Sequence, residues 1–396
     1  MFKYSDIIYV YHMSSKIKVL QVIPKLGYGG AETGCYDLAH YLAEQNCKSY
    51  IITSGGPLLK FIKKEKVKVF RLPVHSKNPI LILLNTIFIS ILILILNIDI
   101  IHARSRAPAW SCLFSCLITR RKFVTTFHGT YNFSNALKKF YNSVMVRSDL
   151  VIAGSNFIFD HINKNYSDLL DDKRKLLVIF RGINTEYYSN STITDEKIKN
   201  FLSSSILSSE TFKILLPGRL TRWKGQEMFI ESLNLLRTQY SKENFQAIIL
   251  GSHQGRKVYY KKLISTAEKY QLNKKIIFLP HFKDLPVLYY ISDLVVSSSI
   301  EPEAFGRVAV EAQSMEKPIL ASDLGGSKET VIDGKSGFLF KNNDSNNLAQ
   351  HLNNIMEMDK SKLQSIGNEG RKNVLKKFDV EKMCYSTFLE YKKLIK

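Results

Sequence analysis

The chain has 396 residues, which is too long for one ordinary hydrophobic core, so two domains of about 190 residues each are expected. Hydrophobic residues make up 45% of the chain and charged residues 23%, a composition that argues against general disorder. The formal net charge of +21 predicts attraction to a polyanion, either nucleic acid, acidic lipid headgroups or a phosphorylated substrate.

The N-terminal end shows no secretory signal, and the cysteines form no recognisable framework. Residues 1–12 precede a second methionine, Met13, which leads directly into the first expected strand. We therefore expect a start at Met13, with residues 1–15 as a poorly ordered extension. The five cysteines are an odd number, and the close pair Cys112 and Cys116 has no second pair at matching spacing. Reduced thiols in a cytosolic protein are expected rather than disulfides or a metal site.

Both halves of the chain alternate short apolar runs with helical stretches. Such alternation predicts βα units and a mostly parallel sheet in each half. In the first half the runs are residues 17–23, 50–53, 67–72, 98–102, 122–127, 150–153 and 176–180. After a polar, Ser-rich stretch at 189–210, the second series is 212–216, 247–250, 276–279, 294–298, 319–322 and 338–340.

This pattern predicts an α/β protein of two doubly wound, Rossmann-like domains that face a central cleft. We expect an N-terminal domain at residues 16–188 and a C-terminal domain at 189–379. Residues 380–396 form an amphipathic, basic terminal helix, which is a candidate to pack back on the N-terminal domain.

A glycine loop follows the first expected strand. The β-branched run at 17–23 ends at Pro24, and a helix is expected to begin near Ala31 after Gly29 and Gly30. Strand, glycine loop and helix together form the arrangement that cradles phosphate groups, and Gly30 would allow close approach of the backbone. The spacing differs from GxGxxG, which argues against a nicotinamide dinucleotide.

Residues 80–98 depart from the alternation of short apolar runs and helical stretches, because they are almost continuously apolar and carry no charge. By length alone the segment could span a bilayer. It lies between two expected strands of one sheet, however, and a span would place the halves of one domain on opposite sides. We therefore expect a helix that covers the sheet, with one face as a candidate for contact with a membrane interface.

Charged side chains follow several expected strands, at the edge of the sheet where α/β proteins bind ligands. His128 follows the run at 122–127, Arg104 and Arg106 follow the run at 98–102, and Arg219 and Lys224 follow the run at 212–216. A lone His is more often structural, and a basic loop is often only solvated. The position at a strand end favours phosphate binding by the cluster of Arg219 and Lys224, since Arg can chelate two oxygens and Lys adds a point charge. Arg104 and Arg106 occupy the equivalent place in the first domain.

Two carboxylates flank a glycine after the run at 294–298. Glu303 would lie on the loop, Phe305 and Gly306 would present backbone N–H groups to an anion, and Glu311 would sit about two turns into the following helix. Taken alone, the pair reads as one acid that complements the helix dipole and one surface acid.

Together these residues resemble the retaining family-4 glycosyltransferases of the GT-B fold, and the nearest resemblance is to bacterial lipopolysaccharide-core and related cell-envelope enzymes. The likeness runs from about residue 16 to the C-terminus. Two positions depart from the family pattern: Arg307 stands where an aliphatic residue is frequent, and Arg181 where Asn is frequent. The matching elements are residues 29–32, 128–129, 181–184, 218–219 and 224–225, the Glu303 and Glu311 pair, 325–326 with Glu329, 333–334 and Gly337.

The resemblance implies that residues 16–188 are the acceptor-side domain and residues 189–379 the nucleotide-sugar-binding domain, and it implies a role for each candidate residue. Arg219 and Lys224 would grip the donor diphosphate, helped by amides near Phe305 and Gly306 and by the loop of Gly29 and Gly30. Glu311 would accept hydrogen bonds from the ribose, Glu303 would hold the transferred sugar, and His128 would lie near that sugar. The catalytic set is thus His128, Glu303, Arg219 and Lys224, with Arg104 and Arg106 on the acceptor side.

The implied function is retaining transfer of a hexose from a nucleotide sugar, with a UDP-sugar favoured, to a cell-envelope glycan or lipid-linked acceptor. The family's front-face mechanism needs no metal, the sequence contains no Asp-x-Asp motif that would bind one, and no cofactor is expected. We expect a cytoplasmic protein, with an anionic inner membrane face as a candidate partner and no nucleic-acid ligand. The alternatives are a GT-B epimerase or phosphorylase, and a non-catalytic basic protein that binds membranes or nucleic acid.

Overall fold

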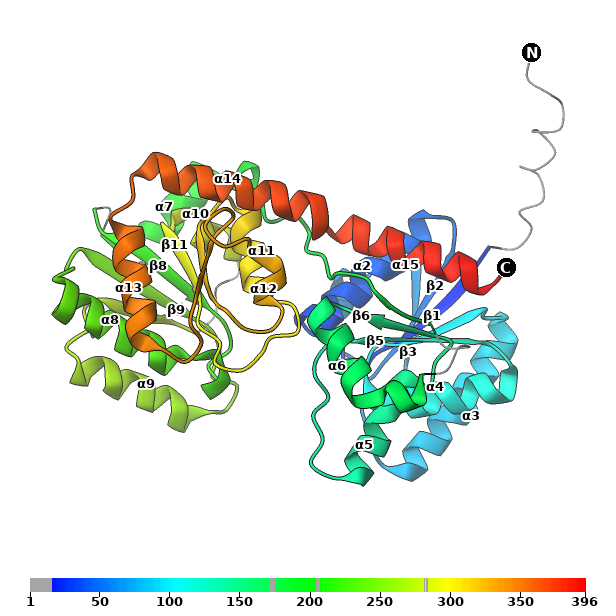
Figure 1. Ribbon diagram of the computed structural model, residues 1–396. Coiled ribbons are helices and arrows are strands. Elements are labelled where there is room, and N and C mark those ends of the chain that lie inside the picture. The colour runs from blue at the N-terminus through cyan, green and yellow to red at the C-terminus, as the bar shows by residue number, and fades with distance from the viewer. Residues whose placement is uncertain (1–15, 171–174, 204–206, 209, 281, 283) are drawn as a thin grey trace, which may run out of the picture. The chain divides into compact units, whose positions relative to one another are not determined.

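The computed structural model describes residues 16–170, 175–203, 207–208, 210–280, 282 and 284–396 (Figure 1). The expected extension at 1–15 and the start at Met13 lie outside these residues. The chain forms two compact units. The N-terminal unit contains the described residues up to Phe180 together with Val380–Lys396, and the C-terminal unit contains Arg181–Asp379.

The N-terminal unit is built on a seven-stranded parallel sheet with the order β3-β2-β1-β4-β5-β6-β7. Its strands are β1 (Lys18–Val22), β2 (Lys48–Thr53), β3 (Val67–Arg71), β4 (Ile100–Ala103), β5 (Lys122–Phe127), β6 (Leu150–Ala153) and β7 (Lys175–Val178). Its α-helices are α2 (Gly30–Glu44), α3 (Pro79–Leu96), α4 (Arg106–Thr119), α5 (Ala136–Ser143), α6 (Asn156–Tyr166) and α15 (Val380–Leu394). Helices α2 and α15 lie over one face of the sheet, and α3 and α4 lie over the other (Figure 1).

The C-terminal unit repeats this plan on a six-stranded parallel sheet with the order β10-β9-β8-β11-β12-β13. Its strands are β8 (Phe212–Pro217), β9 (Phe245–Leu250), β10 (Ile276–Leu279), β11 (Leu294–Ser297), β12 (Ile319–Ser322) and β13 (Phe338–Phe340). Its α-helices are α7 (Asp195–Ser203), α8 (Gln226–Tyr240), α9 (Lys257–Lys269), α10 (Leu285–Ile291), α11 (Arg307–Ser314), α12 (Ser327–Thr330), α13 (Ser345–Met356) and α14 (Lys360–Lys377).

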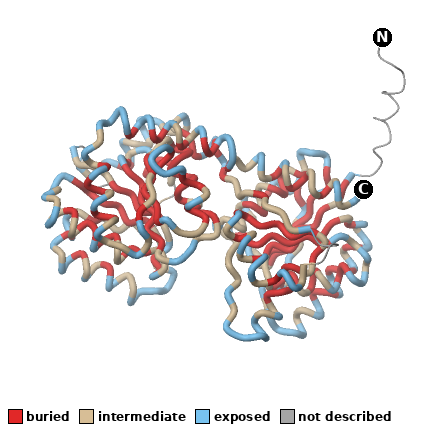
Figure 2. The backbone as a smooth tube through the Cα atoms, viewed as in Figure 1, coloured by how far each residue is buried: buried red, intermediate tan, exposed pale blue. Residues whose placement is uncertain are grey.

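Burial explains why these runs become strands. Parallel strands are covered on both faces, so they read as continuous apolar runs, and β4, β6, β9, β11 and β12 are buried at every residue. Figure 2 shows both sheets as the buried centre of their own unit. All thirteen apolar runs expected from the sequence are strands, and the expected α/β fold with two Rossmann-like domains is confirmed.

The strand order of each sheet reverses at its centre, where the first strand lies beside the fourth. In the N-terminal unit β1 pairs with β4, with Val19 opposite Ile100. In the C-terminal unit β8 pairs with β11, with Ile214 opposite Leu294. Ligands of doubly wound sheets bind beyond the carboxyl ends of the strands at this reversal. The segments that follow β1 and β4, and those that follow β8 and β11, are therefore the positions to search for a site.

The boundary between the units falls at Phe180 and Arg181, eight residues before the expected boundary at residue 188. Local pairing explains the difference. Ile183 N–H donates to Phe378 O at 2.9 Å, and Thr185 Oγ1 donates to Asp379 Oδ2 at 2.5 Å, so residues 181–188 belong with the end of α14. The polar stretch at 189–210 also carries structure, because it contains α7.

The terminal helix α15 packs on α2 within the N-terminal unit. Its Cys384, Phe388 and Tyr391 are buried in the same cluster as Val19 and Ile100 of the sheet. The pairing of Ile183 with Asp379 means that the chain enters and leaves the C-terminal unit at adjacent points. All five cysteines are buried thiols.

Candidate functional site

The central pair of the candidate site is Lys224 and Glu303 in the C-terminal unit. Lys224 Nζ lies 2.7 Å from Glu303 Oε1, and the two side chains are only 12% and 11% exposed. Ser299 Oγ donates to the same carboxylate oxygen at 2.5 Å. Burial raises the pKa of Glu303, but the charge and hydrogen bond of Lys224 and the seryl hydroxyls outweigh burial, so the net pKa lies below its ordinary value of 4.5. Glu303 is therefore an acceptor rather than an acid at neutral pH.

A tight turn after β8 delivers Lys224 to this position. Gly225 has φ of 69°, and a Cβ there would lie 1.9 Å from Ser298 O, so the residue must be a glycine. Ser298 Oγ donates to Lys224 O at 3.0 Å, and Ile300 N–H donates to Trp223 O at 2.8 Å. The loop after β8 is thus fastened to the loop after β11.

Arg219 lies on the same loop and is exposed. Its guanidinium lies 6.0 Å from the centre of the Trp223 ring, and Lys224 Nζ lies 4.6 Å from the same centre. Trp223 thus keeps two cations on one short turn, at the point where the sheet order reverses. Gln226 Nε2 donates to Arg219 O at 2.9 Å and holds the turn at the start of α8. Two cations so placed suit an anion of diphosphate type.

The loop from Glu303 to Gly306 is held by a pair of glycines from the neighbouring strand end. Gly326 N–H donates to Glu303 O at 2.8 Å. A Cβ on Gly325 or Gly326 would lie 2.7 Å from Glu303 O or 2.6 Å from Phe305 Cα, so both positions need glycine for this close approach. Phe305 is buried against Phe378 at a ring distance of 5.6 Å and anchors the loop. Gly306 has φ of 80° and caps the N-terminus of α11.

Glu311 lies one turn into α11 instead of two, because the helix begins at Arg307. Its carboxylate is 6% exposed and accepts from Arg307 Nε at 2.5 Å and from Tyr289 Oη at 2.7 Å. Burial and the Glu311 charge raise the pKa of Tyr289 and of Tyr188 well above 10.0, so both phenols stay neutral donors. Arg307, one of the two positions that depart from the family pattern, thus forms an ion pair with Glu311.

The N-terminal unit carries the remaining candidates. Gly29 caps the N-terminus of α2 and Gly30 is its first residue, so the expected strand, glycine loop and helix are present. His128 directly follows β5 and is half-buried. Arg104 is buried and donates to Gln21 Oε1 at 3.1 Å, whereas Arg106 donates to Asn142 Oδ1 at 2.7 Å and lies 4.3 Å from the Tyr131 ring. Both arginines already have partners in their own unit.

Sequence reasoning missed an apolar pocket of about 130 Å³ beyond the ends of β8, β9 and β10. It is lined by Leu220, Ile249, Gly251, His253, Tyr260, Phe278, Leu279 and Pro280. Gly251 is required there, because a Cβ would lie 1.8 Å from Gly218 O. The available signal was that His253 and Phe278 lie at the ends of strands β9 and β10, but single aromatic residues are common in cores.

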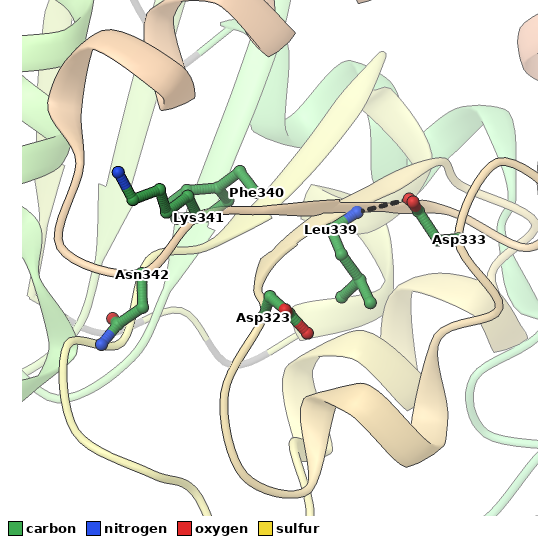
Figure 3. Close-up of a pocket in the computed structure, with 6 residues that line it drawn as sticks. All are labelled: Asp323, Asp333, Leu339, Phe340, Lys341 and Asn342. Carbon is green, nitrogen blue, oxygen red and sulfur yellow. Dashed lines mark hydrogen bonds between the residues drawn. The ribbon is translucent and has the colours of Figure 1, made fainter.

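A larger pocket of about 440 Å³ lies beside β12 and β13 and is lined by Asp323, Asp333, Leu339, Phe340, Lys341 and Asn342 (Figure 3). Asp333 accepts from Leu339 N–H at 2.8 Å, and Asp323 pairs with Lys328 at 3.2 Å. Because carboxylates line this pocket, it suits an anionic ligand less well than the turn of Arg219 and Lys224. Within the described ranges, no group of three or more His, Cys, Asp or Glu is arranged to hold a metal ion.

Comparisons with known proteins agree with this geometry. The family model of glycosyl transferases group 1 matches residues 197–373, and that of glycosyltransferase family 4 matches residues 28–187. A glycosyltransferase of Rickettsia africae, known from its crystal structure, is 35% identical, with a TM-score of 0.88 over 96% of this chain and 99% of that chain. An uncharacterized glycosyltransferase of Methanocaldococcus jannaschii is 28% identical over 92% of this chain and 94% of its own length.

The Anabaena protein HepE, solved with UDP and glucose, shares the fold with a TM-score of 0.78 at 24% identity, over 95% of this chain and 100% of that one. With two parallel-sheet units, a glycine loop after β1 and paired cations after β8, the chain belongs to the GT-B glycosyltransferases, with a family 4 domain followed by a group 1 domain.

Proposed function

We propose that this glycosyltransferase moves a hexose from a UDP-sugar to a cell-envelope glycan or lipid-linked acceptor, with lipopolysaccharide core as the nearest acceptor class, and retains the anomeric configuration. The observation that carries the donor part is the Lys224 and Glu303 pair at the strand reversal of the C-terminal unit. HepE, which has the same fold, is solved with UDP and glucose. We further propose a cytoplasmic enzyme at the inner membrane face that needs no metal or other cofactor.

The chemistry of transfer fits the charges of the C-terminal unit. Cleavage of the bond between the anomeric carbon and the phosphate oxygen leaves negative charge on the diphosphate and positive charge on the carbon. Arg219, Lys224 and the N-terminus of α11 would stabilise the first charge. The departing phosphate oxygen takes the proton of the acceptor hydroxyl, while that hydroxyl oxygen bonds to the anomeric carbon from the same face.

Lys224 can serve Glu303 and the diphosphate together. An ammonium has three N–H donors, and Glu303 occupies one of them at 2.7 Å. Glu303 in turn is an ionised acceptor that would bind hydroxyls of the transferred sugar. A general base is not needed, so the lowered pKa of Glu303 does not conflict with this role.

Glu311 would bind the ribose hydroxyls of the donor. An ionised carboxylate offers about four lone-pair sites, and Arg307, Tyr289 and Tyr188 use three of the sites of Glu311. The apolar pocket of Tyr260 and Phe278 would take the flat nucleobase, because its walls are rings and aliphatic groups. The nucleobase would then lie at the ends of β10 and β9, the phosphates at the end of β8, and the transferred sugar at the end of β11.

The candidates of the N-terminal unit would act on the remaining parts of the substrates. We assign Gly29 and Gly30 to the diphosphate through backbone N–H groups, and His128 to the transferred sugar. Arg106 is the better acceptor candidate of the two arginines, since Arg104 is 5% exposed and already bonded to Gln21.

The test begins with a thermal-shift screen of sugar nucleotides, because a ligand well above its Kd stabilises the folded protein. The best donor is then supplied with lipid-linked and core-glycan acceptors, and the anomeric configuration of the product is read by NMR. Lys224→Ala and Glu303→Gln should each abolish transfer in folded protein. The matched control is the exposed pair of Lys242 and Glu357, 2.9 Å apart in the same unit, where Lys242→Ala and Glu357→Gln should be fully active.

Full turnover by both Lys224→Ala and Glu303→Gln would refute the assignment of these two residues. Release of an epimerised sugar, or of a sugar phosphate from the donor without an acceptor, would instead identify an epimerase or a phosphorylase.

A further inference from the structure

Helix α3 presents its apolar side chains outward and its polar side chains inward. Its exposed large hydrophobic residues are Ile80, Leu83, Leu84, Ile87, Phe88, Ile91, Leu94 and Ile95. The side that faces the N-terminal unit buries Asn85, Thr86 and Ser90 beside Ile89 and Ile93. A surface helix of a water-soluble protein has the opposite arrangement. The outer side of α3 is therefore better suited to an apolar environment than to water.

The exposed apolar surface continues over α4 and α5. Phe114, Leu117 and Ile118 of α4 are exposed, as are Leu137 and Phe140 of α5. We call the exposed apolar side chains of α3, α4 and α5 the apolar face. Figure 1 shows α3 and α4 side by side on one side of the N-terminal unit. An apolar surface that runs over three helices exceeds what isolated exposed side chains explain.

Hydrogen bonds fasten α3 to α4 as a rigid pair. Ser111 Oγ donates to Ile82 O at 3.0 Å, and Ser115 Oγ donates to Thr86 O at 3.0 Å. The helix has the length and composition to cross a membrane, with 28% of its residues buried. The sheet excludes a span, because β3 before α3 and β4 after it lie in one parallel sheet with only β2 and β1 between them. Because α3 must return the chain to that sheet, it can contact a membrane only by lying along the membrane surface.

Cations border the apolar face at both ends of α3. Lys77 is exposed just before the helix begins. At the other end Arg121 donates to Asn97 Oδ1, the C-cap of α3, at 2.6 Å, and Arg120 beside it is exposed. Beside α5, the guanidinium of Arg147 lies 5.6 Å from the Phe140 ring. An apolar centre with a cationic border is the pattern of a protein surface that binds anionic lipid.

The segment that carries α3, α4 and α5 has a larger excess of basic over acidic residues than the chain as a whole. From Arg71 to Ser148 the chain has ten Lys and Arg residues and a single acid, Asp99. The Asp99 carboxylate accepts from the backbone N–H of Lys18 at 2.8 Å and so serves the fold. Asp168 pairs with Lys139 of α5 at 3.7 Å, but the segment that carries α3, α4 and α5 has too few carboxylates for a second copy of the same face to offset its cations.

We infer that the apolar face docks on the surface of an anionic phospholipid bilayer, with α3 parallel to the membrane plane. At 1.5 Å per residue the helix is about 27 Å long, so one row of aliphatic side chains enters the boundary of headgroups and acyl chains. Lys77 and Arg120 at its two ends contact lipid phosphates. The inference extends the proposed lipid-linked acceptor, but it is measured without donor or acceptor, so either proposal can fail alone.

The test is co-sedimentation of the full chain with phosphatidylcholine vesicles, prepared with and without phosphatidylglycerol. The wild-type protein should bind the anionic vesicles, and Leu94→Glu/Ile95→Glu should weaken partitioning by about tenfold or more. Lys77→Glu/Arg120→Glu should remove most of the preference for phosphatidylglycerol, and added salt should do the same. The matched control is Val258→Glu, which changes an 85% exposed aliphatic residue of α9 and should bind as the wild type does.

The replaced side chains are exposed, so the variants should keep their thermal unfolding midpoints, which differential scanning calorimetry checks. Absence of wild-type binding to anionic vesicles would overturn the inference. Equal binding by Leu94→Glu/Ile95→Glu and the wild type would do the same. A dimer in sedimentation equilibrium that this variant dissociates, without any vesicle binding, would assign the face to a second copy of the chain.

Discussion

Lys224 and Glu303 join the loops that follow β8 and β11. Their 2.7 Å contact lies at the centre of the C-terminal sheet, where these two strands are neighbours and the strand order reverses. The two residues are 79 positions apart in the sequence. Both side chains are nearly buried, so the charges are compensated within the protein and screened little by water. A diphosphate that arrives here meets an ammonium whose position is already fixed, which lowers the cost of organising the site during transfer.

The first prediction concerns the stability of this pair. Lys224→Ala leaves the Glu303 carboxylate buried without its cation, so the free energy of unfolding should fall by about 3 kcal/mol. The double variant Lys224→Ala/Glu303→Gln should recover part of this loss, because it removes the unpaired charge. Urea unfolding of the single and double variants measures the coupling. If the changes in unfolding free energy of the two single variants add up to that of the double variant, Lys224 and Glu303 do not stabilise the protein as a coupled pair.

The second prediction is a pH dependence of stability that originates at Glu303. Its folded pKa lies below the ordinary 4.5, so the unfolded chain binds this proton more readily. The stabilisation is fully present above 4.5 and is lost as the pH falls through the folded pKa. Glu303→Gln should therefore flatten the loss of unfolding free energy below 4.5. The control Glu231→Gln changes an exposed acid of α8 in the same unit, and a curve for Glu303→Gln that follows this control would contradict the prediction.

The third prediction concerns Glu311 as the ribose acceptor. Glu311→Gln keeps the shape of the side chain but replaces an ionised acceptor, so the Kd for UDP should rise by about tenfold. Isothermal titration calorimetry measures the change, and Glu357→Gln is again the control. An unchanged Kd would assign Glu311 to the packing of Arg307 and Tyr289 alone.

The sequence predicted the fold well because burial on both faces leaves continuous apolar runs, and glycine or charged residues mark the strand ends. It also placed Arg219, Lys224, Glu303 and Gly306 on loops that parallel topology brings to one edge of a sheet. It missed what depends on long-range packing. The observed domain boundary differs from the expected one because Ile183 pairs with Asp379. The ion pair of Arg307 with Glu311 forms because α11 begins at Arg307.

His102 is another residue that the sequence left unexplained. It lies in β4 as part of a short apolar run, and its partner Tyr391 is 289 positions away on α15. Only the return of the terminal helix to the N-terminal unit brings the two together. A lone His in a strand gives no sign of such a contact, whereas the amphipathic pattern of α15 does indicate that one of its faces must pack.

The last prediction tests how His102 holds α15 on the N-terminal unit. Its Nδ1 lies 2.5 Å from Tyr391 Oη and its Nε2 lies 2.7 Å from Thr126 Oγ1, so a neutral ring satisfies both contacts with one donor and one acceptor. Tyr391→Phe removes one partner from a buried ring and should lower the free energy of unfolding by about 2 kcal/mol. The control is Tyr385→Phe, which changes a tyrosine of the same helix that is 53% exposed.

His102 should also make the stability of the N-terminal unit depend on pH. Burial and, secondarily, the charge of Arg104 hold the pKa of His102 well below 6.5, so the folded state keeps the ring neutral. The unfolded chain binds the proton first, and the stability of the N-terminal unit should fall as the pH drops below 6.5. His102→Gln should reduce this slope although it weakens the fold at neutral pH, and the remainder comes from His40 and His161, whose pKa values burial also lowers. Urea unfolding at a series of pH values measures the slope, and an unchanged slope in His102→Gln would show that another group titrates.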